Sequence, residues 1–293
     1  MIAAFAPLWV ITFLGWGAAR FGVFGATAQH GLAQFAFIVA IPAVIFSTLV
    51  KIPFDELPLV PLAAFALSTL IVGLLGFWLV RRKSLNERVI AAMASAYVNS
   101  GNLGIPVAIF VLGDASLVVA VVAFQTVIVT PLVVGLLDRR RILELPLKVP
   151  VVMASLLGVV FSAAGWHLPP DVLRPFEFLG AAAAPTALFA LGMSLHMPDS
   201  RPNLHRPELG WTVLAKIVLQ PLVAFLIGRY VFHLPPLDLL AVTLFAGLPT
   251  AQNTFVYATQ YKVPSDLSRD AVLVTSVLSL LSLSLILWLL GQR

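Results

Sequence analysis

Apolar residues occur in long runs along this chain, and short polar stretches separate the runs. Most runs are about 17 to 25 residues long, the length that an α-helix needs to cross the hydrocarbon core of a bilayer. We therefore predict an all-α polytopic membrane protein, with one transmembrane unit over 1–293 and no extramembrane domain. The predicted spans are 3–19, 32–50, 58–80, 89–112, 115–137, 149–166, 176–195, 209–231, 237–259 and 271–290.

Two of the predicted spans contain residues that break helices next to residues with polar side chains. Glycine is permissive in its backbone angles, and proline removes a hydrogen bond and clashes with the preceding turn. We therefore expect the helix to be interrupted in both spans. The residues concerned are Gly101, Gly104 and Pro106 beside Asn99 and Asn102 in the fourth span, and Gly247 and Pro249 beside Gln252 and Asn253 in the ninth.

A helix that breaks at mid-membrane depth leaves backbone N–H and C=O groups unpaired. Lipid cannot bond to them, so each break must face protein or a watery cavity. If each second half-helix starts at its proline, its free N–H groups and positive dipole end favour an anionic substrate. The amides of Asn99, Asn102, Gln252 and Asn253 are the candidate substrate ligands. Alternatively, these amides complete the broken backbone, and the two roles are compatible.

Composition and charge support the membrane assignment and set an orientation. The chain is 60% hydrophobic and 11% charged, with no cysteine, and its mean hydropathy is +1.01. Its basic residues lie in short turns, so the net charge of +5 indicates membrane orientation and not nucleic acid. The positive-inside rule places both termini outside the cytoplasmic membrane. Thirteen basic residues lie on the side taken as cytoplasmic (Arg20, Arg81, Arg82, Lys83, Arg88, Arg139, Arg140, Arg141, Lys148, Arg201, Arg206, Lys262, Arg269), and four lie opposite (Lys51, Arg174, Arg229, Arg293).

Prolines within the spans indicate an internal repeat. Pro42 and Pro106 are 64 residues apart, as are Pro185 and Pro249, and the two pairs are offset by 143 residues. We expect Pro42 and Pro185 to interrupt their helices as well. Two halves of five spans, 1–137 and 149–293, fit this offset. Because five is odd, the second half would enter the membrane from the opposite side, which gives inverted repeats.

The two broken spans resemble the crossover motifs of the auxin efflux carrier family. The segments concerned are 99–106 and 247–253, and 184–195 is similar to the seventh span of that family. The resemblance implies ten spans, a scaffold domain, a transport domain with crossed helices, and a homodimer. It also places Gln125 beside the crossing, although a lone buried glutamine equally serves to join helices. The short loop after the fifth span resembles bacterial members, for which the implied substrates are dicarboxylates such as malate or malonate.

Other chemistry-bearing residues narrow the candidate functions. Lys216 is the one ionisable residue well inside a span; it is a candidate electrostatic site, but we expect its stem to reach the cytoplasmic headgroups. The acidic residues lie in loops or at span ends, which argues against a sodium- or proton-coupled carrier, the main alternative. The five histidines lack metal-ligand spacing. We expect no metal, no cofactor and no enzyme activity, and favour a secondary carrier of a small organic anion.

Overall fold

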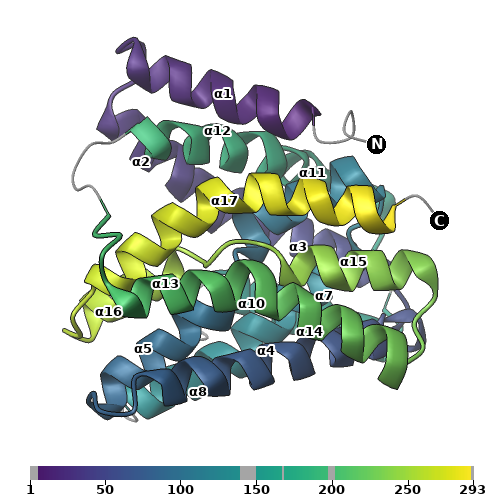
Figure 1. Cartoon of the computed structure of the whole chain (residues 1–293). Helices are drawn as coiled ribbons and strands as arrows, with labels where there is room; N and C mark the ends of the chain where they lie inside the picture. Colours follow the sequence, from purple (N-terminus) through teal and green to yellow (C-terminus); the bar gives the residue numbers. More distant parts are fainter. Residues whose placement is uncertain (1–5, 139–149, 167, 197–201, 292–293) are drawn as a thin grey trace.

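The computed structural model describes residues 6–138, 150–166, 168–196 and 202–291, and these form a bundle of helices (Figure 1). Among the described residues there is no β-strand, only one isolated β-bridge. The basic residues Arg139, Arg140, Arg141, Lys148 and Arg201, which were used to predict the orientation, lie outside the described ranges.

The helices follow the order of the predicted apolar runs. Those of the first half are α1 (Ala6–Arg20), α2 (Ala26–Phe35), α3 (Ile41–Lys51), α4 (Leu59–Leu79), α5 (Leu85–Ala96), α6 (Ile105–Val107), α7 (Ser116–Phe124) and α8 (Thr130–Leu137). Those of the second half are α10 (Pro150–Ala164), α11 (Pro170–Ala181), α12 (Ala183–His196), α13 (Pro207–Leu214), α14 (Gln220–Leu226), α15 (Pro236–Ala246), α16 (Asn253–Gln260) and α17 (Asp266–Leu290).

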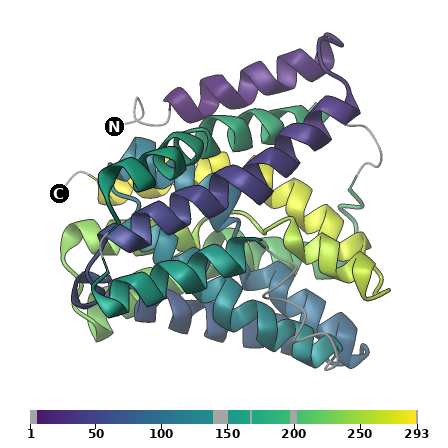
Figure 2. The same ribbon diagram turned by 180° about the vertical axis from the view of Figure 1, so that it is seen from behind.

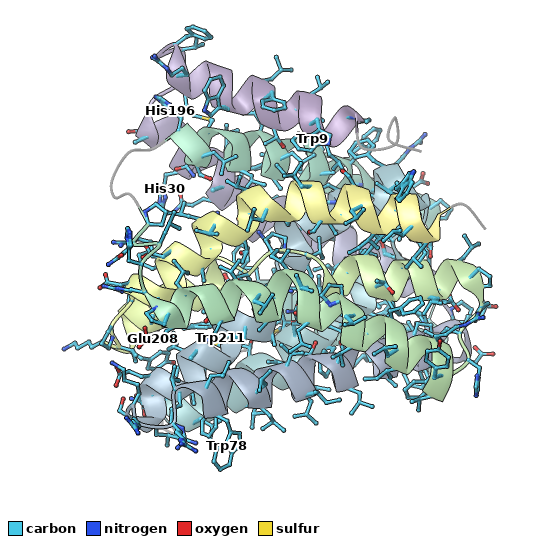
Figure 3. All side chains as sticks on the ribbon, viewed as in Figure 1. Trp9, His30, Trp78, His196, Glu208 and Trp211 are labelled. Atoms are coloured by element: carbon cyan, nitrogen blue, oxygen red, sulfur yellow. The ribbon has the colours of Figure 1, made fainter. Side chains whose placement is uncertain are left out.

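Six helical stretches in the described part of the chain are long and apolar enough to cross a bilayer: Ala26–Lys51, Leu59–Leu79, Ser116–Leu137, Pro170–His196, Pro207–Val231 and Asp266–Leu290. Shorter apolar helices occupy Ser100–Leu112, Pro150–Ala164 and Pro236–Ala246. Large apolar side chains such as Leu74, Trp78 and Leu222 are exposed along the flanks. Charged side chains gather at the two ends of the bundle (Figure 3). This distribution is that of a multi-pass membrane protein.

Four prolines inside helical stretches follow a widened turn and do not end the helix. A π-helical turn ends two residues before each of them: Pro42, Pro106, Pro131 and Pro221. Proline has no N–H, and its ring clashes with the carbonyl one turn earlier, so a wider turn relieves both problems. The expectation that Pro42 interrupts its helix is therefore wrong. Pro185 lies in the first turn of α12, just after a turn at Ala182 that separates α11 from α12.

The helices pack mainly in two groups. One group consists of α1, α2, α3, α10, α11 and α12. In the other, α4 and α5 pack with α13 to α17, and α8 packs on α5 (Figure 2). Two glycines bring the backbones of α1 and α12 together. A Cβ atom on Gly15 would lie 2.1 Å from the Phe189 carbonyl oxygen, and one on Gly192 would lie 2.0 Å from the Thr12 carbonyl oxygen. Small residues at a helix contact are typical of membrane helix packing.

Candidate functional site

Two helices are interrupted in the middle of the bundle, and their interruptions touch. α5 ends at Ala96 and the helical chain resumes at Ser100, whereas α15 ends at Ala246 and α16 begins at Asn253. The extended segments between them pair antiparallel through a bridge from Val98 to Thr250. The backbone N–H of Asn99 donates to the Pro249 carbonyl oxygen at 2.9 Å, and that of Ala251 donates to Tyr97 at 3.0 Å. The two halves of the chain therefore meet through backbone hydrogen bonds, in a short segment that we call the crossing.

The second half-helices do not begin at the prolines, which corrects the sequence-based expectation. The first resumes at Ser100, before Pro106, and the second begins at Asn253, after Pro249. Asn99 sets the first start because its side-chain Oδ1 accepts a hydrogen bond from the Asn102 backbone N–H at 3.2 Å. Asparagine is among the preferred residues at a helix N-cap for this reason.

The glycines near the crossing serve close packing. Gly101 and Gly104 lie inside the helical stretch after the break. A Cβ atom on Gly104 would lie 2.9 Å from Val118 Cγ2 and 3.0 Å from Leu248 Cδ1. Gly247 follows the last residue of α15, and a Cβ atom there would lie 2.8 Å from the Ile286 side chain. Larger side chains at these positions would push the two broken helices and their neighbours apart.

Gln125 binds the broken backbone directly. Its Nε2 donates to the Val98 carbonyl oxygen at 3.1 Å, and its Oε1 accepts a hydrogen bond from the Ser100 hydroxyl. The side chain is buried. Of the two roles that the sequence left open for Gln125, the structure shows the one in which its amide joins helices at the crossing.

Lys216 and Gln220 bind the ends of both first half-helices. The Lys216 Nζ donates to the carbonyl oxygen of Ala246, the last residue of α15, at 2.8 Å, and to Gln220 Oε1 at 2.5 Å. The Gln220 Nε2 donates to the carbonyl oxygen of Ala96, the last residue of α5, at 3.0 Å. Lys216 is 0% exposed. The expectation that its stem reaches the headgroups is therefore wrong, because the ammonium binds a carbonyl oxygen inside the bundle.

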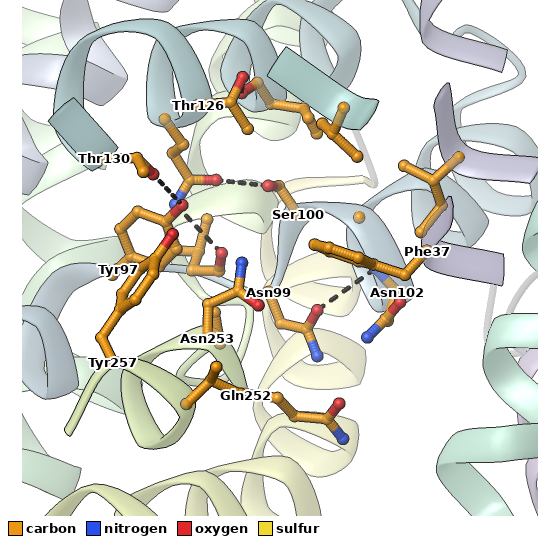
Figure 4. Close-up of a pocket in the computed structure, with 18 of the residues that line it drawn as sticks. Phe37, Tyr97, Asn99, Ser100, Asn102, Thr126, Thr130, Gln252, Asn253 and Tyr257 are labelled. Carbon is orange, nitrogen blue, oxygen red and sulfur yellow. Dashed lines mark hydrogen bonds between the residues drawn. The ribbon is translucent and has the colours of Figure 1, made fainter. Parts of the chain in front are cut away.

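A cavity of about 200 Å³ lies against the crossing, and the carboxamides predicted from sequence line it. Asn99, Asn102, Gln125, Gln252 and Asn253 all contribute to its wall. Figure 4 shows the amide groups of Asn99, Asn102 and Gln252 around the same space. Of the other residues predicted for the site, Gly101 also lines this cavity. The remaining ones do not line it: Pro42, Pro106, Pro185, Pro249, Gly104, Gly247 and Lys216.

Asn99 carries an unused donor at this cavity. Its Nδ2 is buried and has no hydrogen-bond partner, although its Oδ1 caps the helix that follows. A buried polar group without a partner costs about 1–3 kcal/mol and is uncommon in folded proteins. The oxygen of this amide thus completes the backbone, as one of the two roles that the sequence left open requires. Contact between its nitrogen and a substrate stays a prediction.

Several wall residues were not predicted from sequence. Tyr97 lies at the break, with its hydroxyl 3.1 Å from the Thr130 hydroxyl, and Phe37 and Tyr257 come from other helices. Tyr97 and Ser100 adjoin the Asn99 motif, which is the one signal that could have identified them. Tyr257 follows Asn253 by four residues, so it lies on the same face of α16, and this spacing could have identified it. Phe37 stands in ordinary apolar surroundings in the sequence, so nothing there marks it.

Acidic residues within the described part of the chain stay away from the cavity. Its lining contains no Asp or Glu, and no group of three or more His, Cys, Asp or Glu in the described ranges is placed to hold a metal ion. Asp270 is buried at the start of α17, where it accepts hydrogen bonds from the Asn203 backbone N–H at 3.1 Å and from Arg269. Glu177 forms an ion pair with Lys51. The polar surface that the cavity offers is thus neutral amide and hydroxyl.

Comparison with known proteins identifies relatives along the whole length. The chain is 29% identical over 307 residues to the "Putative malonate transporter" of Rhizobium meliloti, which covers 97% of this chain and 93% of the relative. It is also 29% identical over 291 residues to an uncharacterized transporter of Methanothermobacter thermautotrophicus, with 94% of each chain covered. An uncharacterized transporter of Methanocaldococcus jannaschii is 24% identical over 308 residues, with 96% of each covered.

A family model described as "Membrane transport protein" matches residues 1–146 and 140–287. The two matches together extend over nearly the whole chain, and they include both broken helices and every residue of the crossing. The chain therefore belongs to the membrane transport protein family, the family of auxin efflux carriers that its crossover motifs resemble.

Proposed function

We propose that this protein is a secondary carrier that moves a small organic anion, a mono- or dicarboxylate, across the cytoplasmic membrane by alternating access. The observation that carries the proposal is Asn99, a residue of the cavity wall whose Nδ2 donor is buried without a hydrogen-bond partner. A substrate carboxylate would accept its hydrogen bond, and bonds to charged groups are stronger than those between neutral groups. Asn102, Gln252 and Asn253 would add further amide donors.

The backbone at the crossing supports an anion in the same place. The helical stretch Ser100–Leu112 and helix α16 both start beside the cavity, and both Ser100 and Asn253 line it. Helix N-termini carry about half a positive charge and free N–H groups, which favour anions. The positive ends of two helices and a set of amide donors therefore converge on one small space.

The size of the cavity favours a small substrate. Sites for drug-sized ligands occupy about 300–1,000 Å³, and this cavity has about 200 Å³. A three- or four-carbon dicarboxylate fits that space better than a bulky aromatic acid. The relative from Rhizobium meliloti carries malonate in its printed name, so malonate is the first substrate that we would test.

The alternative, a sodium- or proton-coupled carrier with the same crossed helices, is less well supported. Coupling ions at such breaks bind unwound carbonyl oxygens or carboxylates. Here the carbonyl oxygens of Ala96, Tyr97, Val98, Ala246 and Pro249 each accept a hydrogen bond from a protein donor. Among the described residues, no carboxylate lines the cavity. We therefore propose transport that needs no coupling cation.

We further propose the predicted arrangement in the membrane: ten spans in two inverted five-helix repeats, 1–137 and 149–293, assembled as a homodimer in the inner membrane. The start of α1 and the end of α17 lie at the same end of the bundle (Figure 1), which supports placing both termini on one side. Gln260 and Val151, at the wall of the cavity, lie next to the basic loops. With those loops in the cytoplasm, the cavity would open inward.

Transport in proteoliposomes tests the function. Purified protein should accumulate labelled malonate or exchange it for internal malonate, at equal rates with sodium or potassium outside. A carrier without activity on any mono- or dicarboxylate would contradict the proposal, and a strict sodium or proton requirement would support the coupled alternative.

The orientation is tested separately with single cysteines near each end, because the natural chain contains none to interfere. Labelling of a C-terminal cysteine from the cytoplasm alone would refute the predicted topology.

A further inference from the structure

One pair of side chains on the stretch from α13 to α14 reaches both broken helices. Lys216 and Gln220 are four residues apart, so they lie on the same face of their helix. Lys216 binds the carbonyl oxygen of Ala246, and Gln220 binds that of Ala96. Gln220 also accepts a hydrogen bond from Lys216, which fixes the two side chains relative to each other. Both side chains are completely buried.

The two carbonyl oxygens are the C-terminal ends of the first half-helices. A helix C-terminus carries about half a negative charge, and burial among other helices does not screen it as water would. Left alone, two such ends beside the crossing would repel an anion. A protonated Lys216 would offset them, and Gln220 pairs the second oxygen without adding charge.

The charge of Lys216 is not matched by an acidic side chain. Among the described residues, its hydrogen-bond partners are Gln220 and the Ala246 carbonyl oxygen, and none of the ion pairs includes it. A buried charge without a partner is costly, so such residues in membrane helices are typically functional. Capping alone does not require a charge here, because the equivalent end at Ala96 is bound by the neutral amide of Gln220.

We propose that Lys216 is a tethered cation that gives the crossing its net positive charge and takes the place of a coupling cation. This inference rests on the proposed function. Lys216 does not line the cavity, so it is a positioning residue that acts through the field at the crossing and through the ends of α5 and α15. The attraction between Lys216 and a bound anion grows in proportion to the charge of the anion. The site is therefore selective for dianions over monoanions.

The expected size of the effect follows from the geometry. Gln220, which holds Lys216, contacts Ala96, and Asn99 lies three residues beyond Ala96, at most about 11 Å along the chain. For a charge that acts over a distance on the order of 10 Å, and an effective dielectric constant of about 20, one unit charge changes affinity by roughly tenfold per substrate charge. A dianion would therefore lose roughly a hundredfold, and a monoanion roughly tenfold, when Lys216 is neutralised.

The test compares malonate with its monomethyl ester, which has nearly the same skeleton and one charge fewer. Dissociation constants are measured for the wild type, for Lys216→Met and for Lys216→Gln, whose amide is able to donate to Ala246. Neutralisation should lower the preference for malonate over the ester by roughly tenfold. Gln220→Met is the matched control, because it removes the cap at Ala96 without changing the charge, and it should leave the preference unchanged.

The outcomes separate this inference from the proposed function. If the wild type binds malonate and both Lys216 variants keep its preference over the ester, Lys216 is only a cap and the inference is overturned. Equal weakening of both ligands leads to the same conclusion. If the wild type binds neither anion, the proposed function fails and the inference fails with it. Thermal unfolding shows which variants are folded, and Lys216→Gln decides the question if Lys216→Met is not.

Discussion

Replacing Asn99 separates the two roles of its amide. In the structure, Oδ1 caps the helix that begins at Ser100, and Nδ2 is buried without a partner. Asn99→Ser retains a side-chain oxygen for the cap and removes the amide Nδ2 donor, leaving only the shorter hydroxyl, whereas Asn99→Ala removes both. Serine caps helices about as well as asparagine, and replacing a cap by alanine costs about 1 kcal/mol.

Stability and affinity should then change in opposite directions in Asn99→Ser. Burying an unpaired donor costs about 1–3 kcal/mol, so its removal should leave the ligand-free protein as stable as the wild type or more stable. Substrate affinity should fall, because a hydrogen bond to a charged group contributes about 1.5–3 kcal/mol, or roughly 10- to 150-fold. Asn99→Ala should lose the same affinity and, in addition, the cap.

Two measurements on purified protein decide this prediction. Thermal unfolding without ligand reports stability, and the shift of the unfolding temperature with malonate concentration reports affinity. If Asn99→Ser binds malonate as tightly as the wild type, the free donor does not contact substrate. The cavity would then require another set of ligands, and the reasoning from the unpaired Nδ2 would be refuted.

Three further substitutions test the packing and the helix start. In Gly192→Ala the new Cβ would meet the Thr12 carbonyl oxygen at 2.0 Å, so α1 and α12 must separate and unfolding should be easier by at least about 1–3 kcal/mol; Gly31→Ala, with nothing within 4 Å, is the control. Gly104→Ala should cost about 1–3 kcal/mol and slow transport, because the methyl group would push on Val118 and Leu248; an unchanged transport rate would contradict this role. Ser84→Ala removes a capping box with Glu87 and should cost about 1 kcal/mol near neutral pH. Hydrogen bonds from Ser84 hold the pKa of Glu87 below its usual value of 4.5, so the part of the wild-type advantage that comes from the Ser84 hydroxyl bonding to the Glu87 carboxylate should be present above about pH 4.5 and be lost as acid protonates Glu87. The hydrogen bond from the Glu87 backbone N–H to Ser84 Oγ remains in acid, so an advantage that does not shrink at all in acid would argue against this cause.

The sequence predicted the features that the bilayer itself imposes. Long apolar runs indicated the helices because a spanning segment must be long and apolar. The interruptions near Asn99 and near Gln252 were predicted because glycine is permissive in its backbone angles and proline removes a hydrogen bond and clashes with the preceding turn. These interruptions lie together in the structure, and the predicted carboxamides line one cavity.

Details that depend on neighbouring helices could not be predicted. Lys216 was expected to reach the headgroups, because its stem length was known but the carbonyl oxygen of Ala246, 30 residues away, was not. The position of each break was wrong by several residues, since a local cap at Asn99 outweighs the proline. Phe37 was missed because lipid and protein interior are equally apolar, so hydrophobicity alone does not show which face of a helix lines a cavity.

The antiparallel bridge at the crossing also affects how the chain is made. The backbone N–H of Asn99 finds its partner in Pro249, which the ribosome adds 150 residues later. At about 5–20 residues per second, the first broken helix waits roughly 8–30 s with unpaired backbone groups. During that time those groups must bond to water or to the insertion machinery, because lipid offers them nothing. The first half of this protein therefore cannot mature alone, and nascent chains arrested before Ala251 should be preferred substrates of membrane quality control.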